Sequence, residues 1–361
     1  MAACGENGSE SQPEADMESE STGGAEMAEE TAAGGECAPA GKLSFVCGPQ
    51  NSEDLIQLGD TRWLLAGGLN QEESGGHIYL IDRRAKTYRL AFPGDDPAVN
   101  HDTDMFGACP GPVDTGNFSP HGVDVMDAGD GVYRAYFTSH GAREAIEVFD
   151  IDTSGAMPSV AWVGCVEIPA PSFTNAVAIL PDGGFVATKM FDPTNPKGFA
   201  AVNAGEITGH VWEWHPGGEV TKMEGTDLSG PNGIAVSADG GRMFVAASGT
   251  REIVRYDLTA APPMRQNAVT LGIQPDNLRW SPDGTLVAVG GNHVPPEECD
   301  SPPCMAGWSA VEIDPDTLSA TRIDGVDETN PFQGASTALP VGDALWIGTY
   351  AGDRVAYMLL D

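Results

Sequence analysis

One pattern repeats six times between residue 55 and residue 350: a short apolar run, a polar turn and a second apolar run. The six instances are residues 55–69, 123–140, 177–190, 234–249, 278–292 and 337–350. Asp-Gly and Gly-Asp pairs at the turns favour the positive φ angles that tight β-hairpins need. A further apolar strand segment follows each hairpin. Because six such units occur in series, the sequence predicts an all-β fold, a six-bladed β-propeller.

The composition agrees with many short strands. The chain contains 46 Gly and 27 Pro, which favours turns over long helices, and no segment has a sustained 3.6-residue apolar period. Residues 43–47 precede the first hairpin, and we expect them to pair with a strand from the end of the chain and close the ring. A β-sandwich or a two-domain β protein is the structural alternative.

Charge limits the partners of the chain. The formal net charge is −35, from 53 acidic and 18 basic residues, so nucleic acid and anionic lipid are excluded as partners. Residues 1–40 carry ten acidic residues and no Lys or Arg, the composition of a disordered acidic tether. Residues 41–361 are then the single folded domain.

Cysteine use indicates export. The sequence MAAC at residues 1–4 is typical of the end of a bacterial lipoprotein signal, which would place a lipid anchor on Cys4 and a stalk after it. We therefore expect a periplasmic or outer-surface lipoprotein, and otherwise a secreted protein; an ordinary cysteine at position 4 is the alternative. The other six cysteines allow up to three disulfides. Cys37 with Cys47 and Cys299 with Cys304 are candidate pairs, and no transmembrane segment is predicted.

Polar side chains stand immediately before each hairpin, at the same point of every repeat. The segments are Ser52-Glu53-Asp54, Pro120-His121-Gly122, Thr174-Asn175-Ala176, Pro231-Asn232-Gly233, Pro275-Asp276-Asn277 and Gln333-Gly334-Ala335-Ser336. Equivalent positions of the blades of a propeller face the same axis. These side chains are therefore predicted to converge at the mouth of a central channel.

The oxygen donors among them predict a metal ion. Glu53, Asn175, Asn232, Asp276 and Asn277 offer five side-chain oxygens, and two of these residues carry a charge that balances a divalent cation. Calcium takes six to eight oxygen ligands, whereas magnesium keeps more water and zinc prefers nitrogen and sulfur. An Asn before a strand is usually a turn residue, so the prediction of a calcium site in the channel depends on all five sharing one position in the repeat.

The segments SEDLIQL, SPHGVDV, FTNAVAI, PNGIAVSADG, PDNLRWSPDG and FQGASTALPVGDALWIGT resemble the successive motifs of the paraoxonase/arylesterase family. That family lies within the gluconolactonase-like six-bladed propellers, and the resemblance runs from about residue 48 to the C-terminus. It implies that the five residues above hold a catalytic calcium, with His121 as general base and His140 as its partner.

The same resemblance implies a second, structural calcium, for which Asp54 matches one ligand. The other expected carboxylate falls at Ala176, which has no donor, so the second ion is doubtful. The chain also lacks the disulfide that ties the two ends of such proteins together, because no cysteine follows Cys304.

The expected activity is calcium-dependent hydrolysis of a small-molecule lactone or aryl ester. The metal would polarise the carbonyl, and water activated by His121 would attack it. A sugar-lactone hydrolase or a phosphotriesterase on the same site is the first alternative, since loops 191–204 and 294–308 are expected to set the substrate. A non-enzymatic, calcium-stabilised propeller that binds a partner is the second. No Gly-x-Ser-x-Gly segment is present, which argues against an α/β serine hydrolase.

Overall fold

The structure, a computed structural model, describes residues 37–70, 76–94, 97–299 and 304–360. Residues 1–36, which include Cys4 and most of the predicted tether, lie outside the described residues. Within the described part of the chain, the helices are α1 (Phe199–Asn203) and the 3-10 turn η1 (Pro296–Glu298). Neither is long and apolar enough to cross a membrane.

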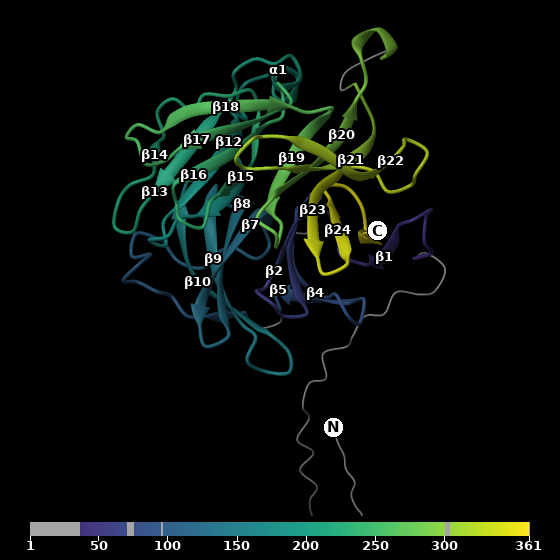
Figure 1. The fold of residues 1–361 in the computed structure, drawn as a ribbon. Coiled ribbons are helices and arrows are strands. Elements are labelled where there is room, and N and C mark those ends of the chain that lie inside the picture. The colour runs from purple at the N-terminus through teal and green to yellow at the C-terminus, as the bar shows by residue number, and fades with distance from the viewer. Residues whose placement is uncertain (1–36, 71–75, 95–96, 300–303, 361) are drawn as a thin grey trace, which may run out of the picture.

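Six sheets are arranged around a common axis (Figure 1), which confirms the predicted six-bladed β-propeller. Blade 1 contains β2 (Ser52–Gln57), β3 (Trp63–Gly68), β4 (His77–Asp82) and β5 (Thr87–Phe92). Blade 2 contains β6 (Ala98–Val99), β7 (Phe118–Gly129), β8 (Val132–Gly141), β9 (Ala145–Asp152) and β10 (Ser159–Glu167). Blade 3 contains β11 (Phe173–Ile179), β12 (Phe185–Phe191), β13 (His210–Trp214) and β14 (Thr221–Lys222).

The remaining three blades follow the same plan. Blade 4 contains β15 (Pro231–Val236), β16 (Arg242–Ala247), β17 (Glu252–Asp257) and β18 (Met264–Thr270). Blade 5 contains β19 (Ile273–Trp280), β20 (Leu286–His293), β21 (Met305–Ile313) and β22 (Ala320–Val326). Blade 6 contains β23 (Ala335–Val341), β24 (Ala344–Thr349), β25 (Arg354–Leu359) and β1 (Ser44–Cys47).

The first strand of the chain closes the ring, as the sequence predicts. Strand β1 pairs antiparallel with β25, with Ser44 opposite Tyr357. In Figure 1 the purple β1 accordingly lies beside the yellow strands near the C-terminus. The predicted disulfide between Cys37 and Cys47 attaches the chain before β1 to this blade.

Blade 2 departs from the four-stranded plan. The two-residue strand β6 adds to its outer edge, parallel to β10, with Ala98 opposite Ala161. A disulfide from Cys109 to Cys165 fastens the segment that follows β6 to β10. This pairing is one that the sequence left open, whereas the short loop closed by Cys299 and Cys304 is as predicted.

The hydrophobic core lies between the faces of successive blades. One cluster, for example, joins Val186 and Val211 of blade 3 to Ile234 and Val245 of blade 4. The innermost strands β2, β7, β11, β15, β19 and β23 contact one another in ring order around the channel. The hairpin turns use the predicted chemistry: Gly183, in the Asp-Gly turn of blade 3, has a φ of 83°, which is open to glycine at little cost.

Candidate metal centre and active site

Every innermost strand has a register shift at the point where the sequence places its polar residues. The shifts fall at Ser52/Asp54, Pro120/Val123, Thr174/Val177, Pro231/Ile234, Pro275/Leu278 and Ala335/Thr337. A β-bulge leaves its extra residues out of the ladder and re-aims their side chains. Six bulges at one level of the ring therefore turn six sets of polar side chains toward the same axis.

Hydroxyl groups from the preceding blade hold these bulges in place. Thr138 Oγ1 donates to the carbonyl oxygen of Asn175 at 2.8 Å, Thr188 Oγ1 donates to that of Asn232 at 2.6 Å, and Ser336 Oγ donates to that of Glu53 at 2.6 Å. The blades also approach closely here. A Cβ at Gly233 would lie 2.5 Å from the carbonyl oxygen of Asp276, which explains why glycine follows Asn232.

The bulged residues meet in one cavity of about 650 Å³. Its lining includes Glu53, His121, Asn175, Asn232 and Asp276. The fifth predicted ligand, Asn277, is buried beside them, and its Nδ2 donates to Glu53 Oε1 at 2.8 Å. The structure thus brings together all five predicted ligands and the predicted base.

Four buried oxygens of this ring accept no hydrogen bond from the residues that the structure describes: Glu53 Oε2, Asn175 Oδ1, Asn232 Oδ1 and Asn277 Oδ1. Leaving a buried acceptor unsatisfied costs about 1–3 kcal/mol, and such groups are rare in folded proteins. Four such oxygens at the bulges of one ring, all from predicted ligands, fit a hard cation that coordinates through oxygen. The residues present therefore fit calcium.

The two carboxyl groups of the ring also favour a cation. Burial raises the pKa of Glu53 well above its usual range, and the neighbouring Asp54 carboxylate raises it further. Burial likewise raises the pKa of Asp276, and the charge of Glu53 adds to the effect. Two buried carboxylates lose hydration and repel each other, which destabilises their charged forms. A divalent cation bound between them would offset both effects.

Asp54 does not face an open site. Its carboxylate accepts hydrogen bonds from Arg279 Nη2, from the backbone N–H of Val123 at 2.8 Å and from Thr337 Oγ1 at 2.7 Å. Arg279 also donates to the carbonyl oxygens of Leu55 and Val123. A guanidinium group already provides the positive charge here, so the residues present do not fit a second metal ion at Asp54.

Arg279 is a functional residue that the sequence interpretation missed. A signal was available, because Arg279 and Asp124 occupy equivalent positions of their repeats, one residue beyond Leu278 and Val123, where other blades carry Ile, Ala or Leu. Burial raises the pKa of Asp124, and the charge of Arg279 opposes that rise. Among the described residues, however, the ion pair of Arg279 is with Asp54, and Asp124 accepts the backbone N–H groups of Val125 and Ile179.

The two predicted catalytic histidines lie in contact. His121 Nδ1 is 3.0 Å from His140 Nε2, and His121 Nε2 is 3.5 Å from Glu53 Oε1. Burial lowers the pKa of His121 to about 4, against the opposing effects of Asp54 and Glu144. The imidazole of His121 is therefore neutral near pH 7 and can accept a proton.

Glu144 is a second residue that the sequence interpretation missed. Its Oε2 is 2.8 Å from His140 Nδ1. The available signal was a carboxylate four residues after the candidate histidine, across a turn that begins at Gly141. Because no other blade has an equivalent, the repeat pattern could not reveal it.

The walls of the cavity are mainly apolar, formed by Leu69, Met190, Phe199, Met305, Trp308 and Tyr350. Asn203, Gln274 and Gln333 add polar groups. Among the described lining residues there is no Lys or Arg. Phe199 and Asn203 are the ends of α1, within segment 191–204, and Met305 and Trp308 lie in β21, at the end of segment 294–308, so residues of both expected loop segments line the cavity from regular elements.

Comparison with protein families identifies the middle of the chain. Residues 134–294 match the family described as SMP-30/Gluconolactonase/LRE-like region. The middle of the chain is thus similar to a gluconolactonase-like region. The gluconolactonase-like region includes His140, Asn175, Asn232, Asp276 and Asn277, whereas Glu53 and His121 precede it. The match supports the wider gluconolactonase-like group, and the paraoxonase/arylesterase assignment remains a prediction.

Several solved structures share the fold at low sequence identity. A gluconolactonase from Xanthomonas campestris is 17% identical with a TM-score of 0.53, covering 90% of this chain and 92% of that one. A calcium-binding regucalcin from Agrobacterium tumefaciens is 11% identical with a TM-score of 0.52, covering 89% and 94%. A luciferin-regenerating enzyme is 14% identical with a TM-score of 0.52, covering 88% and 93%. No curated protein matched the chain in sequence.

Proposed function

We propose that the protein hydrolyses lactones and aryl esters with one calcium ion bound in the channel. The observation that carries this proposal is the group of four unpartnered oxygens, on Glu53, Asn175, Asn232 and Asn277, next to the neutral imidazole of His121. The gluconolactonase-like region supports the proposal, as do structural neighbours named as a gluconolactonase and as a calcium-binding regucalcin.

Each group then has a defined task. Calcium held by Glu53, Asn175, Asn232, Asp276 and Asn277 would act as a Lewis acid toward the carbonyl group of the substrate. His121 accepts a proton from the attacking water at Nε2, because its other ring nitrogen faces His140. The same Nε2–H then protonates the leaving alkoxide or phenoxide. Ester cleavage needs both proton transfers.

The walls of the cavity favour an apolar acyl chain or an aromatic ring on the substrate. Phe199, Met305, Trp308 and Tyr350 provide contact surface of this kind, which binds through area removed from water. With no cationic side chain among the described lining residues, an anionic substituent would have no partner. A sugar lactone is the second candidate, since Asn203 could donate to its hydroxyl groups and the gluconolactonase-like region favours it.

A substrate panel tests this function. Calcium-loaded protein should hydrolyse alkyl-substituted lactones and aryl esters faster than gluconolactone. A calcium chelator should lower every rate by at least about 10²-fold, the scale of losing one main electrostatic contribution to catalysis, and added calcium should restore it. A preference for gluconolactone would favour the sugar-lactone alternative. Hydrolysis that persists in chelator, or no hydrolysis by calcium-loaded protein, would contradict the proposal.

A further inference from the structure

Three side chains form a continuous series that leads away from the cavity. His121 Nδ1 is 3.0 Å from His140 Nε2, and His140 Nδ1 is 2.8 Å from Glu144 Oε2. The other oxygen of Glu144 accepts the backbone N–H of Thr174 at 2.5 Å. The side chains of His140 and Glu144 are only 12% and 18% exposed, so water competes little for these contacts.

The contacts at Glu144 fix where the protons of both rings lie. An ionised Glu144 can only accept, so His140 donates to it from Nδ1, and in a neutral imidazole this is the one N–H. His140 Nε2 is then an acceptor, and it receives the proton on His121 Nδ1. This leaves a lone pair on His121 Nε2, the ring atom that faces Glu53 and the cavity.

We propose that Glu144 is a positioning residue that sets the tautomers of His140 and His121 and thereby prepares His121 Nε2 to act as base. This proposal rests on the proposed hydrolysis. When water attacks the carbonyl carbon, its oxygen forms the new C–O bond, the π pair of the C=O bond moves to the carbonyl oxygen, and one O–H bond of the water breaks. The proton goes to His121 Nε2, and the proton on His121 Nδ1 passes to His140 Nε2, so the positive charge lies on His140 beside Glu144. When the C=O bond re-forms, the C–O bond to the leaving oxygen breaks, and both proton transfers reverse to protonate that oxygen.

The surroundings hold Glu144 and His140 rigidly. The ring of His140 stacks on Phe173 at 4.4 Å between centroids, with 12° between the planes. Phe173 directly precedes Thr174, whose N–H binds Glu144, so one short stretch of backbone fixes two members of the series.

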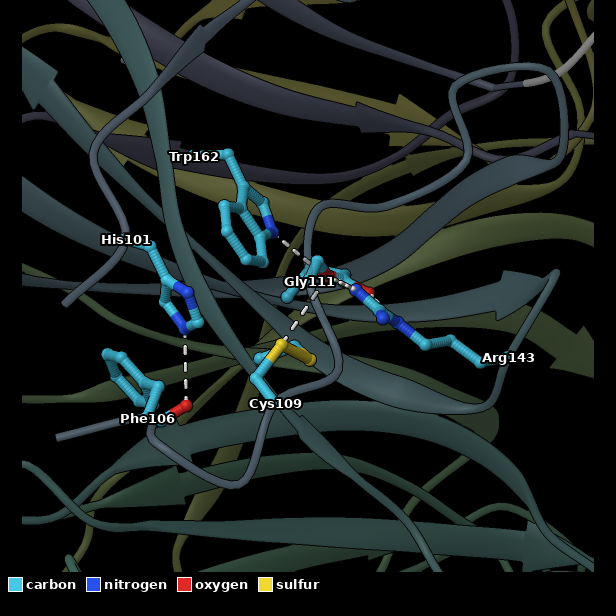
Figure 2. Close-up of a disulfide and its surroundings, with 8 residues drawn as sticks. His101, Phe106, Cys109, Gly111, Arg143 and Trp162 are labelled. Carbon is cyan, nitrogen blue, oxygen red and sulfur yellow. Dashed lines mark hydrogen bonds and ion pairs between the residues drawn. A yellow bond between two sulfur atoms is a disulfide. The ribbon is translucent and has the colours of Figure 1, made fainter. Parts of the chain in front are cut away.

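Figure 2 shows how the residue before Glu144 is anchored. Arg143 forms two hydrogen bonds to the buried carboxylate of Glu147, at 2.6 and 3.0 Å, and another to the carbonyl oxygen of Gly111. Gly111 lies two residues after Cys109, and the disulfide from Cys109 to Cys165 ties this segment to β10. The contacts of Arg143 with Glu147 and Gly111 therefore hold the segment that carries Glu144 in place. A residue that orients another side chain needs such support.

Glu144→Gln tests the proposal with little change in shape. The oxygen of the new amide would keep the bond to Thr174, and its NH₂ group would then donate to His140 Nδ1. That reverses both tautomers and places a hydrogen on His121 Nε2. We expect kcat to fall by about 10²-fold or more, as when a base is held in the wrong tautomer, with KM changed less than about threefold. The ¹⁵N chemical shifts of both rings should report the reversal, in calcium-free as well as calcium-loaded protein.

Two matched variants sharpen the test. Glu144→Asp retains a carboxylate, so it should keep the original tautomers and a kcat at least about tenfold above that of Glu144→Gln. Asp182→Asn alters a surface carboxylate that is 2.7 Å from His215 Nδ1, and it should leave kcat unchanged. Original tautomers or an undiminished kcat in Glu144→Gln, or Glu144→Asp behaving like Glu144→Gln, would overturn the proposal. If the wild type hydrolyses nothing, the proposed function fails, and the ¹⁵N shifts still decide whether Glu144 sets the tautomers.

Discussion

Replacing His121 with Gln should lower kcat/KM for lactone hydrolysis by about 10²–10⁴-fold, the usual contribution of a general base, while calcium remains bound. Gln can still contact His140, but it cannot take a proton from water. Burial keeps His121 neutral, with a pKa of about 4, and its Nε2 faces the ring of oxygens on which the metal assignment rests. Steady-state kinetics and a calcium assay of the purified variant check both expectations.

His215→Gln is the matched control. His215 is 53% exposed and binds Asp182 and Glu213 on the outside of the propeller, so its loss should leave kcat/KM at the wild-type value. Activity near that of the wild type in His121→Gln would move the base elsewhere, with His140 the next candidate. Loss of calcium along with activity would show that His121 supports the metal site and does not act as the base.

The second large effect concerns stability. Arg279→Met should lower the free energy of unfolding by about 3–5 kcal/mol, because it leaves Asp54 buried without its positive partner. The two side chains are only 8% and 1% exposed, and Arg279 also binds two backbone carbonyl oxygens, one on blade 1 and one on blade 2. Denaturant unfolding in the presence of a chelator measures the effect without a contribution from bound calcium.

The double variant Arg279→Met/Asp54→Asn identifies the cause. It removes the uncompensated charge, so it should recover most of the lost stability. Lys197→Met provides a comparison, since Lys197 and Glu206 form an ion pair that is 60% and 47% exposed; its loss should cost about 1 kcal/mol or less. Arg279 does not balance the charge of Asp54 if Arg279→Met loses no more stability than Lys197→Met. The same conclusion follows if the double variant recovers none of the lost stability.

The features that could be predicted from the sequence are those that repeat. Each hairpin carries its own turn signal, and each bulge falls one or two residues before the hairpin. Equivalent positions of the repeats therefore predict Asn175, Asn232 and Asp276 as ligands. The predicted closure by β1 needed only one unpaired apolar segment at the start of the domain. Short local patterns determine the hairpins and the bulges. Because the same pattern occurs six times, each copy supports the interpretation of the others.

The features that could not be predicted break the repeat. Strand β6 and the disulfide from Cys109 to Cys165 belong to an insertion present in one blade. The contact between Arg279 and Asp54 joins residues 225 positions apart, and it exists only because the ring closes. Glu144 reaches His140 through a turn whose course depends on Arg143 and Glu147. No local period encodes contacts of this kind, since they depend on the arrangement of whole blades.

Calorimetric titration of calcium into metal-free wild type and into Asn175→Leu measures whether the bulge residues hold one calcium ion. Among the described residues, the Oδ1 atom of Asn175 has no hydrogen-bond partner, and its Nδ2 contacts the sulfur of Met190 at 3.8 Å. Leu should therefore leave the metal-free protein at least as stable as the wild type, because it removes an unsatisfied acceptor. The wild type should bind one ion per chain, and the variant should bind calcium at least about tenfold more weakly. Equal calcium binding by both proteins, or zinc binding without calcium binding, would contradict this prediction.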